Sequence, residues 1–113
     1  MDEIKNSINM FNEYVGNLPK ASTYISDMIK QDDLPTALNL ILIFSEGMSW
    51  VIEMNTLLVK ENVVKPLNID QLKTFLAEIT EGLLVQDYIL IADLLEYEIV
   101  PFFEEYIKEG EVN

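Results

Sequence analysis

The chain has 113 residues, half of them apolar, and its 20 carboxylates and seven basic residues give a net charge of −13. This length predicts one domain spanning 1–113, and the apolar fraction is too high for an intrinsically disordered chain. Histidine, cysteine and arginine do not occur in the sequence. Their absence excludes disulfides, thiolate chemistry, histidine acid–base catalysis and the usual zinc and haem ligand sets. We therefore expect a noncatalytic protein without a cofactor.

The negative charge is concentrated in the last third of the chain. Residues 78–113 hold ten carboxylates and a single lysine, Lys108. Such a field repels nucleic acids and the anionic surface of a membrane, so we expect a protein partner and no nucleic acid. Residues 1–12 lack the basic start and the apolar run of a secretory signal, which predicts a cytoplasmic location.

Apolar residues recur at helical spacing in the first half of the chain. They keep their phase through Pro19, which predicts one helix over 2–31 that is kinked at this proline. A second helix is predicted over 35–61, with apolar residues around most of its circumference. It is long enough to cross a bilayer, but Glu46 and Glu53 would be costly there. We expect no membrane insertion and place this helix at the centre of the core.

Two shorter helices are predicted in the second half of the chain. Asn68 is the expected N-cap of a helix over 69–85, and Asp87 is that of a helix over 88–108, which contains Pro101. Four helices joined by short connections predict an all-α protein with the architecture of an antiparallel up-down bundle.

The last predicted helix carries apolar residues on two sides. The stripe expected to face the core consists of Tyr88, Ile91, Leu95, Ile99, Phe102 and Tyr106. Leu90, Leu94 and Tyr97 form a second stripe nearly opposite, which one bundle seam does not cover. Another part of the chain, a second copy of the protein or a partner must cover it, and exposed apolar patches with aromatic anchors mark binding sites. We take Leu90, Leu94 and Tyr97, together with Trp50, as candidate partner-binding residues.

Carboxylates of the last helix offer a candidate metal site. Asp93 and Glu96 are three residues apart and can share one helical face, and hard divalent cations prefer oxygen ligands. Further ligands would have to come from Glu46 and Glu53 on the second helix. The sequence lacks the Glu-x-x-His pattern of di-iron bundles and the calcium loop of EF-hands. Solvated surface is the alternative interpretation, and a protein without a metal is the expectation.

The run from Asp87 to Pro101, DYILIADLLEYEIVP, resembles a stretch of the form D-Y-x-L-x-A-D-L-L-E-Y-E-L-x-P in small uncharacterised all-helical proteins of Gram-positive bacteria. The resemblance is limited to this run. It implies a bacterial, cytoplasmic helical protein with no assigned catalytic activity. It also implies that Asp87 caps the helix and that Asp93, Glu96 and Tyr97 are the polar positions to test.

In size, charge and class the chain is also similar to flagellar and secretion export chaperones, which are small acidic helical proteins that bind a partner's amphipathic helix. The expected function is therefore protein–protein interaction. We predict a noncatalytic module that self-associates as a homodimer and binds another protein through its last helix. The alternatives are chaperone-like binding of an amphipathic client helix, and a carboxylate-based divalent-metal protein centred on Asp93 and Glu96.

Overall fold

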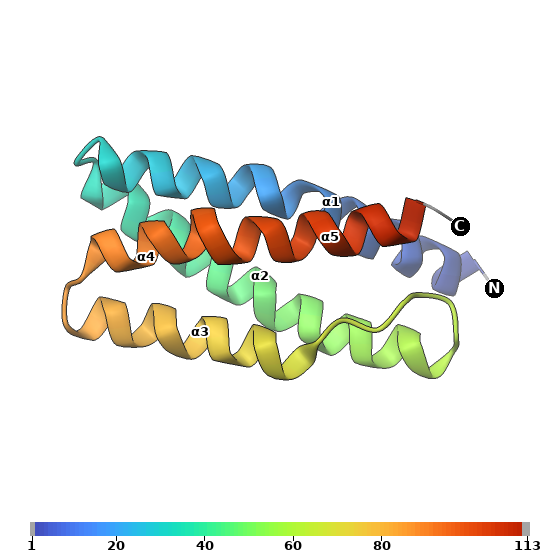
Figure 1. The fold of residues 1–113 in the computed structure, drawn as a ribbon. Helices are drawn as coiled ribbons and strands as arrows, with labels where there is room; N and C mark the ends of the chain where they lie inside the picture. The colour runs from blue at the N-terminus through green and yellow to red at the C-terminus, as the bar shows by residue number, and fades with distance from the viewer. Residues whose placement is uncertain (1, 112–113) are drawn as a thin grey trace.

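The computed structural model describes residues 2–111 as four rods of helix joined by short connections (Figure 1). The first three rods are α1 (Asp2–Lys30), α2 (Leu34–Lys60) and α3 (Ile69–Leu84). The fourth rod consists of α4 (Tyr88–Leu94), a π-helical turn η1 (Leu95–Ile99) and α5 (Val100–Glu111). Residues 2–111 contain no strand, so the predicted all-α bundle is confirmed. α1 also runs through Pro19 without interruption.

α1 is the helix that joins the bundle together. It packs against α2 and along the whole fourth rod, whereas α3 packs against α4 and contacts α2 (Figure 1). The prediction that the second helix is the centre of the core is wrong, because its outer side has no neighbour among the described residues. Its exposed large apolar side chains are Leu38, Leu42, Ile43 and Leu57. By length and composition, α2 is also the one helix in residues 2–111 that could cross a membrane.

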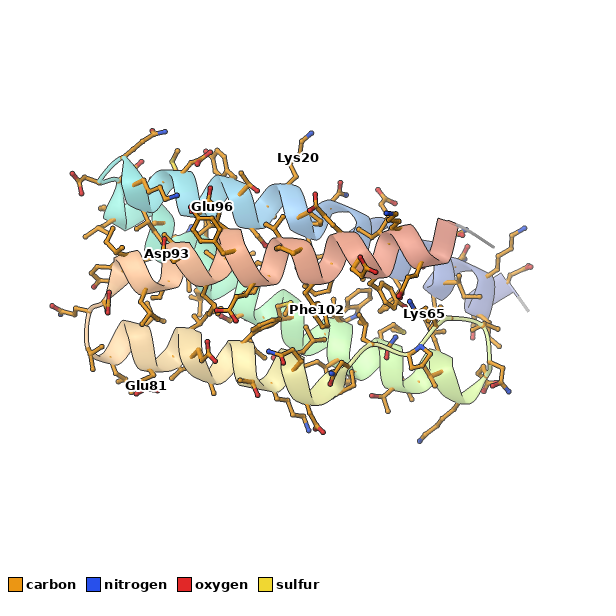
Figure 2. All side chains as sticks on the ribbon, viewed as in Figure 1. Lys20, Lys65, Glu81, Asp93, Glu96 and Phe102 are labelled. Carbon is orange, nitrogen blue, oxygen red and sulfur yellow. The ribbon has the colours of Figure 1, made fainter. Side chains whose placement is uncertain are left out.

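The core is one apolar cluster to which all four rods contribute. In the fourth rod the buried side chains of Ile91, Leu95, Ile99 and Phe103 lie four residues apart. Phe102, which the sequence places on the core side, is half-buried and packs edge-on between the rings of Phe75 and Phe103, at centroid distances of 5.5 and 5.1 Å (Figure 2). The fully buried aromatic of this rod is therefore Phe103.

The π turn explains why residues four apart all face the core. In a regular α-helix each four-residue step rotates the side chain by about 40°, so three steps would carry Phe103 well away from Ile91. A π turn holds one additional residue and offsets most of that rotation. In η1, the backbone N–H of Val100 donates to the carbonyl of Leu95, five residues earlier. Pro101, which follows, has no N–H to donate and lies in the first turn of α5.

The ends of the helices are fixed by side chains and by left-handed residues. The N-caps Asp33, Asn68 and Asp87 each accept a hydrogen bond from the backbone N–H three residues later, which confirms the predicted caps at 68 and 87. The first three helices all end in the same way. Beyond the last turn of each helix, one residue takes the left-handed conformation: Asp32, Asn62 and Gln86. The backbone N–H of the residue after it donates to the carbonyl five residues earlier.

Asn55 ties the connection between α2 and α3 to the core. Its side chain is buried; Nδ2 donates to the carbonyl of Lys65 and Oδ1 accepts from the N–H of Leu67, both at 3.1 Å. The hydroxyl of Tyr106 donates to the same Lys65 carbonyl, and burial raises the pKa of Tyr106. This network closes the end of the bundle opposite the turn between α3 and α4.

Substitution Asn55→Ala is expected to lower the free energy of unfolding by about 2 kcal/mol, because the buried N–H of Leu67 would lose its partner. The exposed Asn39, on the same helix, provides the matched control, and Asn39→Ala should change stability by less than about 0.5 kcal/mol. Chemical denaturation of both variants measures the difference. Equal stabilities would contradict the network.

Candidate functional site

α3 and α4 leave an open groove of about 680 Å³ beside the turn that connects them. One wall comes from α3 and the other from the fourth rod, and Figure 2 labels one carboxylate on each, Glu81 and Asp93. The lining residues are Glu78, Glu81, Gly82, Val85, Asp87, Ile89, Leu90, Asp93, Leu94, Tyr97 and Glu98. We call this surface the α3–α4 groove.

Local sequence sets how closely the two walls approach. A Cβ atom on Gly82 would lie 2.7 Å from Cγ1 of Ile91, so glycine at this position lets α4 pack tightly against α3. Gln86 takes the left-handed conformation that reverses the chain, and Asp87 then caps α4 by accepting from the N–H of Leu90 at 3.1 Å. The groove is thus built on two rigid helices and a short fixed turn.

The groove brings together the three partner-binding candidates of the last helix but exposes two of them. Tyr97 is 68% exposed and Leu90 is 45% exposed, whereas Leu94 is 3% exposed. The prediction of Leu94 as a docking residue is wrong, because its side chain packs in the core and forms the floor of the groove. Val85 and Ile89 are exposed and line the groove as well, although the sequence stripes did not single them out. Because the helix is broken between these two residues, helical periodicity carries no signal for them.

Trp50, the fourth candidate, lies on a different surface. Its ring packs edge-on against Tyr14 of α1 at a centroid distance of 5.4 Å, and it lines a hollow of about 420 Å³ between α1 and α2. The hydroxyl of Tyr14 occupies the space over Gly47, and burial raises the pKa of Tyr14. We call this surface, which also includes Met10, Tyr24, Leu40 and Ile43, the α1–α2 face. The structure therefore does not join Trp50 to the groove.

The charge of the α3–α4 groove has one sign. Five of its eleven lining residues are carboxylates and no lysine lines it. Glu78 and Glu81 stand on the α3 wall, Asp93 and Glu98 stand on the wall of the fourth rod, and Asp87 lies at the turn. An apolar strip formed by Leu90 and Tyr97 is thus bordered by negative charge on both sides.

Of the two carboxylates considered as metal ligands, one is paired with a lysine and the other lines the α3–α4 groove. Glu96 forms an ion pair with Lys30 of α1, and this hydrogen bond, more than any other contact, raises the pKa of Lys30. Asp93 lines the α3–α4 groove, while Glu46 and Glu53 are exposed on α2. In the part of the chain that the structure describes, no group of three or more possible ligands gathers to hold a metal ion. The cation beside Glu96 is a lysine.

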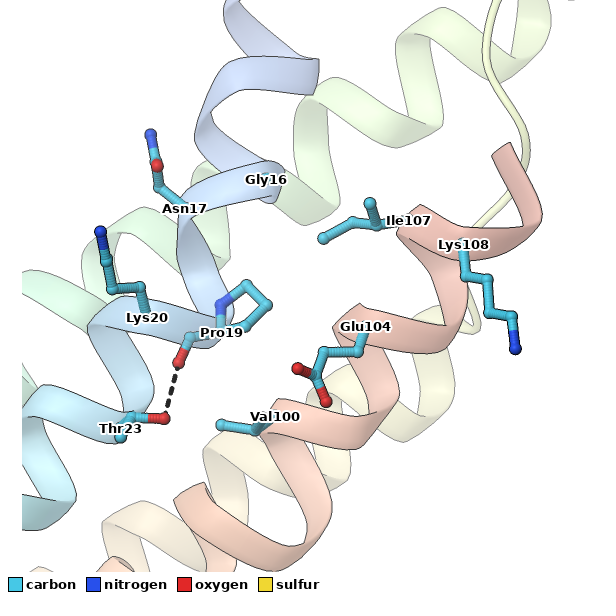
Figure 3. A pocket seen from close by; sticks show the side chains of 9 residues that line it. All are labelled: Gly16, Asn17, Pro19, Lys20, Thr23, Val100, Glu104, Ile107 and Lys108. Carbon is cyan, nitrogen blue, oxygen red and sulfur yellow. Dashed lines mark hydrogen bonds between the residues drawn. The ribbon is translucent and has the colours of Figure 1, made fainter. Parts of the chain in front are cut away.

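A third hollow, of about 530 Å³, lies between α1 and α5 beside Pro19. The hydroxyl of Thr23 donates to the carbonyl of Pro19 at 3.1 Å (Figure 3). Figure 3 also shows that the side chains of Lys20 and Lys108 extend away from one another. The two lysines of this hollow therefore do not converge on one point, and Glu104 is the one carboxylate among its lining residues.

Comparison with protein families assigns the whole bundle to one family. The model of a domain of unknown function, DUF8042, matches residues 6–109. The chain belongs to this family. The DUF8042 match spans all four rods and includes every residue of the α3–α4 groove. No curated protein and no solved structure matches the chain.

Substitution of two leucines tests which side chains of this DUF8042 groove are exposed to solvent. Leu94→Ala should lower the free energy of unfolding by about 2–4 kcal/mol, because it removes a buried side chain and leaves a cavity. Leu90→Ala, with the same chemistry one turn earlier, should cost less than about 1 kcal/mol, since much of Leu90 is already in water. Chemical denaturation decides between them. Similar losses for the two variants would show that Leu90 is covered.

Proposed function

We propose that this DUF8042 protein is a noncatalytic interaction module that binds another protein at the α3–α4 groove. The observation that carries the proposal is the exposure of Tyr97 and Leu90 beside Val85 and Ile89 on one surface. Contiguous exposed apolar patches mark interaction sites, and aromatic side chains are common anchors at their centres. Rigid walls on α3 and α4 also limit the ordering cost of binding.

The chemistry of the lining supports binding more than catalysis. Its titratable side chains are five carboxylates and one tyrosine, and none of them is buried. Catalytic acids and bases generally depend on burial or on a partner charge that moves their pKa toward the working pH. The groove is open, none of these groups is enclosed, and no lysine stands among them.

Self-association is the second proposal, and it is better supported at the α1–α2 face than at α4. If two copies met through the α3–α4 groove, their contact would bring ten carboxylates together, five from each copy. The two hollows of the α1–α2 face have one charged lining residue between them, Glu13. Met10, Tyr24 and Ile43 are more than half exposed around the Tyr14–Trp50 pair. A chain of net charge −13 can approach its copy with less repulsion over this surface, where Glu13 is the one charged lining residue, than over the α3–α4 groove.

Site-specific photo-crosslinking in the native cell tests both proposals at once. The crosslinking residue p-benzoylphenylalanine replaces Tyr97 in the groove, Ile43 on the α1–α2 face, or Leu42, which is exposed on α2 outside both surfaces. We expect a defined adduct with another protein from position 97, because the groove is the docking surface. We expect an adduct of twice the chain mass from position 43 and no defined adduct from position 42.

The outcomes separate the two surfaces. No adduct from position 97, or the same adducts from positions 97 and 42, would contradict the docking role of the groove. An adduct of twice the chain mass from position 97 would place self-association at the groove instead. A lack of dimer adducts from position 43 would remove the second proposal and leave the first.

A further inference from the structure

We infer that the occupant of the α3–α4 groove is a basic amphipathic helix of a partner protein. This inference rests on the proposed function and names the chemistry of the partner. It follows from three features of the groove: the direction of its apolar strip, the placement of its carboxylates, and the sign of the charge on the rest of the chain.

The apolar strip has the length and direction expected of a helix-binding surface. Leu90 and Tyr97 are separated by seven residues, or about 10 Å along the fourth rod, with Leu94 between them as the floor. The groove runs between two antiparallel helices, so a third helix can lie along it and pack on both. Such a helix would present apolar residues at positions i, i+3 or i+4, and i+7. Val85 and Ile89 extend the apolar contact at the turn.

The carboxylates stand where the polar flanks of that helix would lie. Glu78 and Glu81 border the strip on α3, and Asp93 and Glu98 border it on the fourth rod. A helix seated on Leu90 and Tyr97 would thus meet negative charge along both of its sides. Lysine or arginine at its flanking positions would complement these charges, whereas glutamate would be repelled.

The groove is poorly suited to other occupants of the right size. A second copy of the chain would add another net charge of −13 and a second set of carboxylates. Nucleic acids and anionic membranes are repelled by the same field. No lysine lines the groove, and Lys30, which lies near enough to interact with Asp93 and Tyr97, is paired with Glu96. One paired lysine does not balance five carboxylates, so a partner that brings positive charge would complement the groove.

Two synthetic helical peptides of about 14 residues, four turns of helix, provide the probe. Both carry leucine at the positions that face the groove; one has lysine at all flanking positions and the other has glutamate. Binding of the fluorescently labelled peptides to the full-length protein is followed by fluorescence anisotropy. We expect the lysine peptide to bind and the glutamate peptide to bind at least about tenfold more weakly. Added salt should weaken the binding of the lysine peptide.

Matched variants distinguish seating in the groove from general attraction to an acidic protein. The double substitution Glu78→Lys with Glu81→Lys should weaken binding of the lysine peptide at least about tenfold, because it reverses the charge of the α3 wall. Glu46→Lys with Glu53→Lys makes the same change in net charge on the exposed side of α2 and should weaken it less than about threefold. Tyr97→Ala should also weaken binding, whereas Leu42→Ala should not.

Each outcome decides the inference. Equal binding of the two peptides, or equal effects of the two double substitutions, would overturn it. Failure of the lysine peptide to bind at all would overturn it too. In that case a heteromeric photo-adduct at position 97 would still support the interaction module, so loss of the partner chemistry and loss of the proposed function remain distinguishable.

Discussion

Pro101 has no backbone N–H and cannot donate the α-helical bond that this position would otherwise supply to Tyr97. The chain adapts one turn earlier, where Val100 donates to the carbonyl of Leu95 and the helix takes in one additional residue. Because of that residue, side chains spaced by four positions stay on the inner side of the rod. The π turn thereby brings Phe103 onto the same inner side as Ile91, Leu95 and Ile99, all of which are buried.

Fixing the inner side of the fourth rod also determines what its other sides can do. On the side toward α1, Glu96 pairs with Lys30 and is occupied. On the side toward α3, Leu90 and Tyr97 remain in contact with water next to five carboxylates. Five of the 20 carboxylates of the chain thus surround the apolar strip. In the proposed function these carboxylates select the partner, because the charge that repels other copies of the chain would attract a basic helix.

Much of the fold could be predicted from the sequence, because helical periodicity and N-caps are local signals. All four rods were expected within about three residues of their observed ends, and the caps Asn68 and Asp87 were identified. The π turn could not be predicted, since reading a sequence at about 100° per residue assumes a regular α-helix. That assumption placed Leu94 outside, where the structure buries it, and it selected Phe102 as the core aromatic, whereas Phe102 is half-buried and Phe103 is the fully buried ring. The role of Asn55 depends on a loop that reaches it from twelve residues away, which periodicity does not report.

The central claim is that the fourth rod presents Leu90 and Tyr97 to solvent while Leu94, between them, is enclosed. Solvent paramagnetic relaxation, measured by NMR with a neutral gadolinium chelate, tests this at each side chain. The account predicts strong relaxation of the Leu90 methyl groups and the Tyr97 ring, and protection of the Leu94 methyl groups comparable to that of Ile91. Protection of Leu90 and Tyr97, or exposure of Leu94, would contradict it.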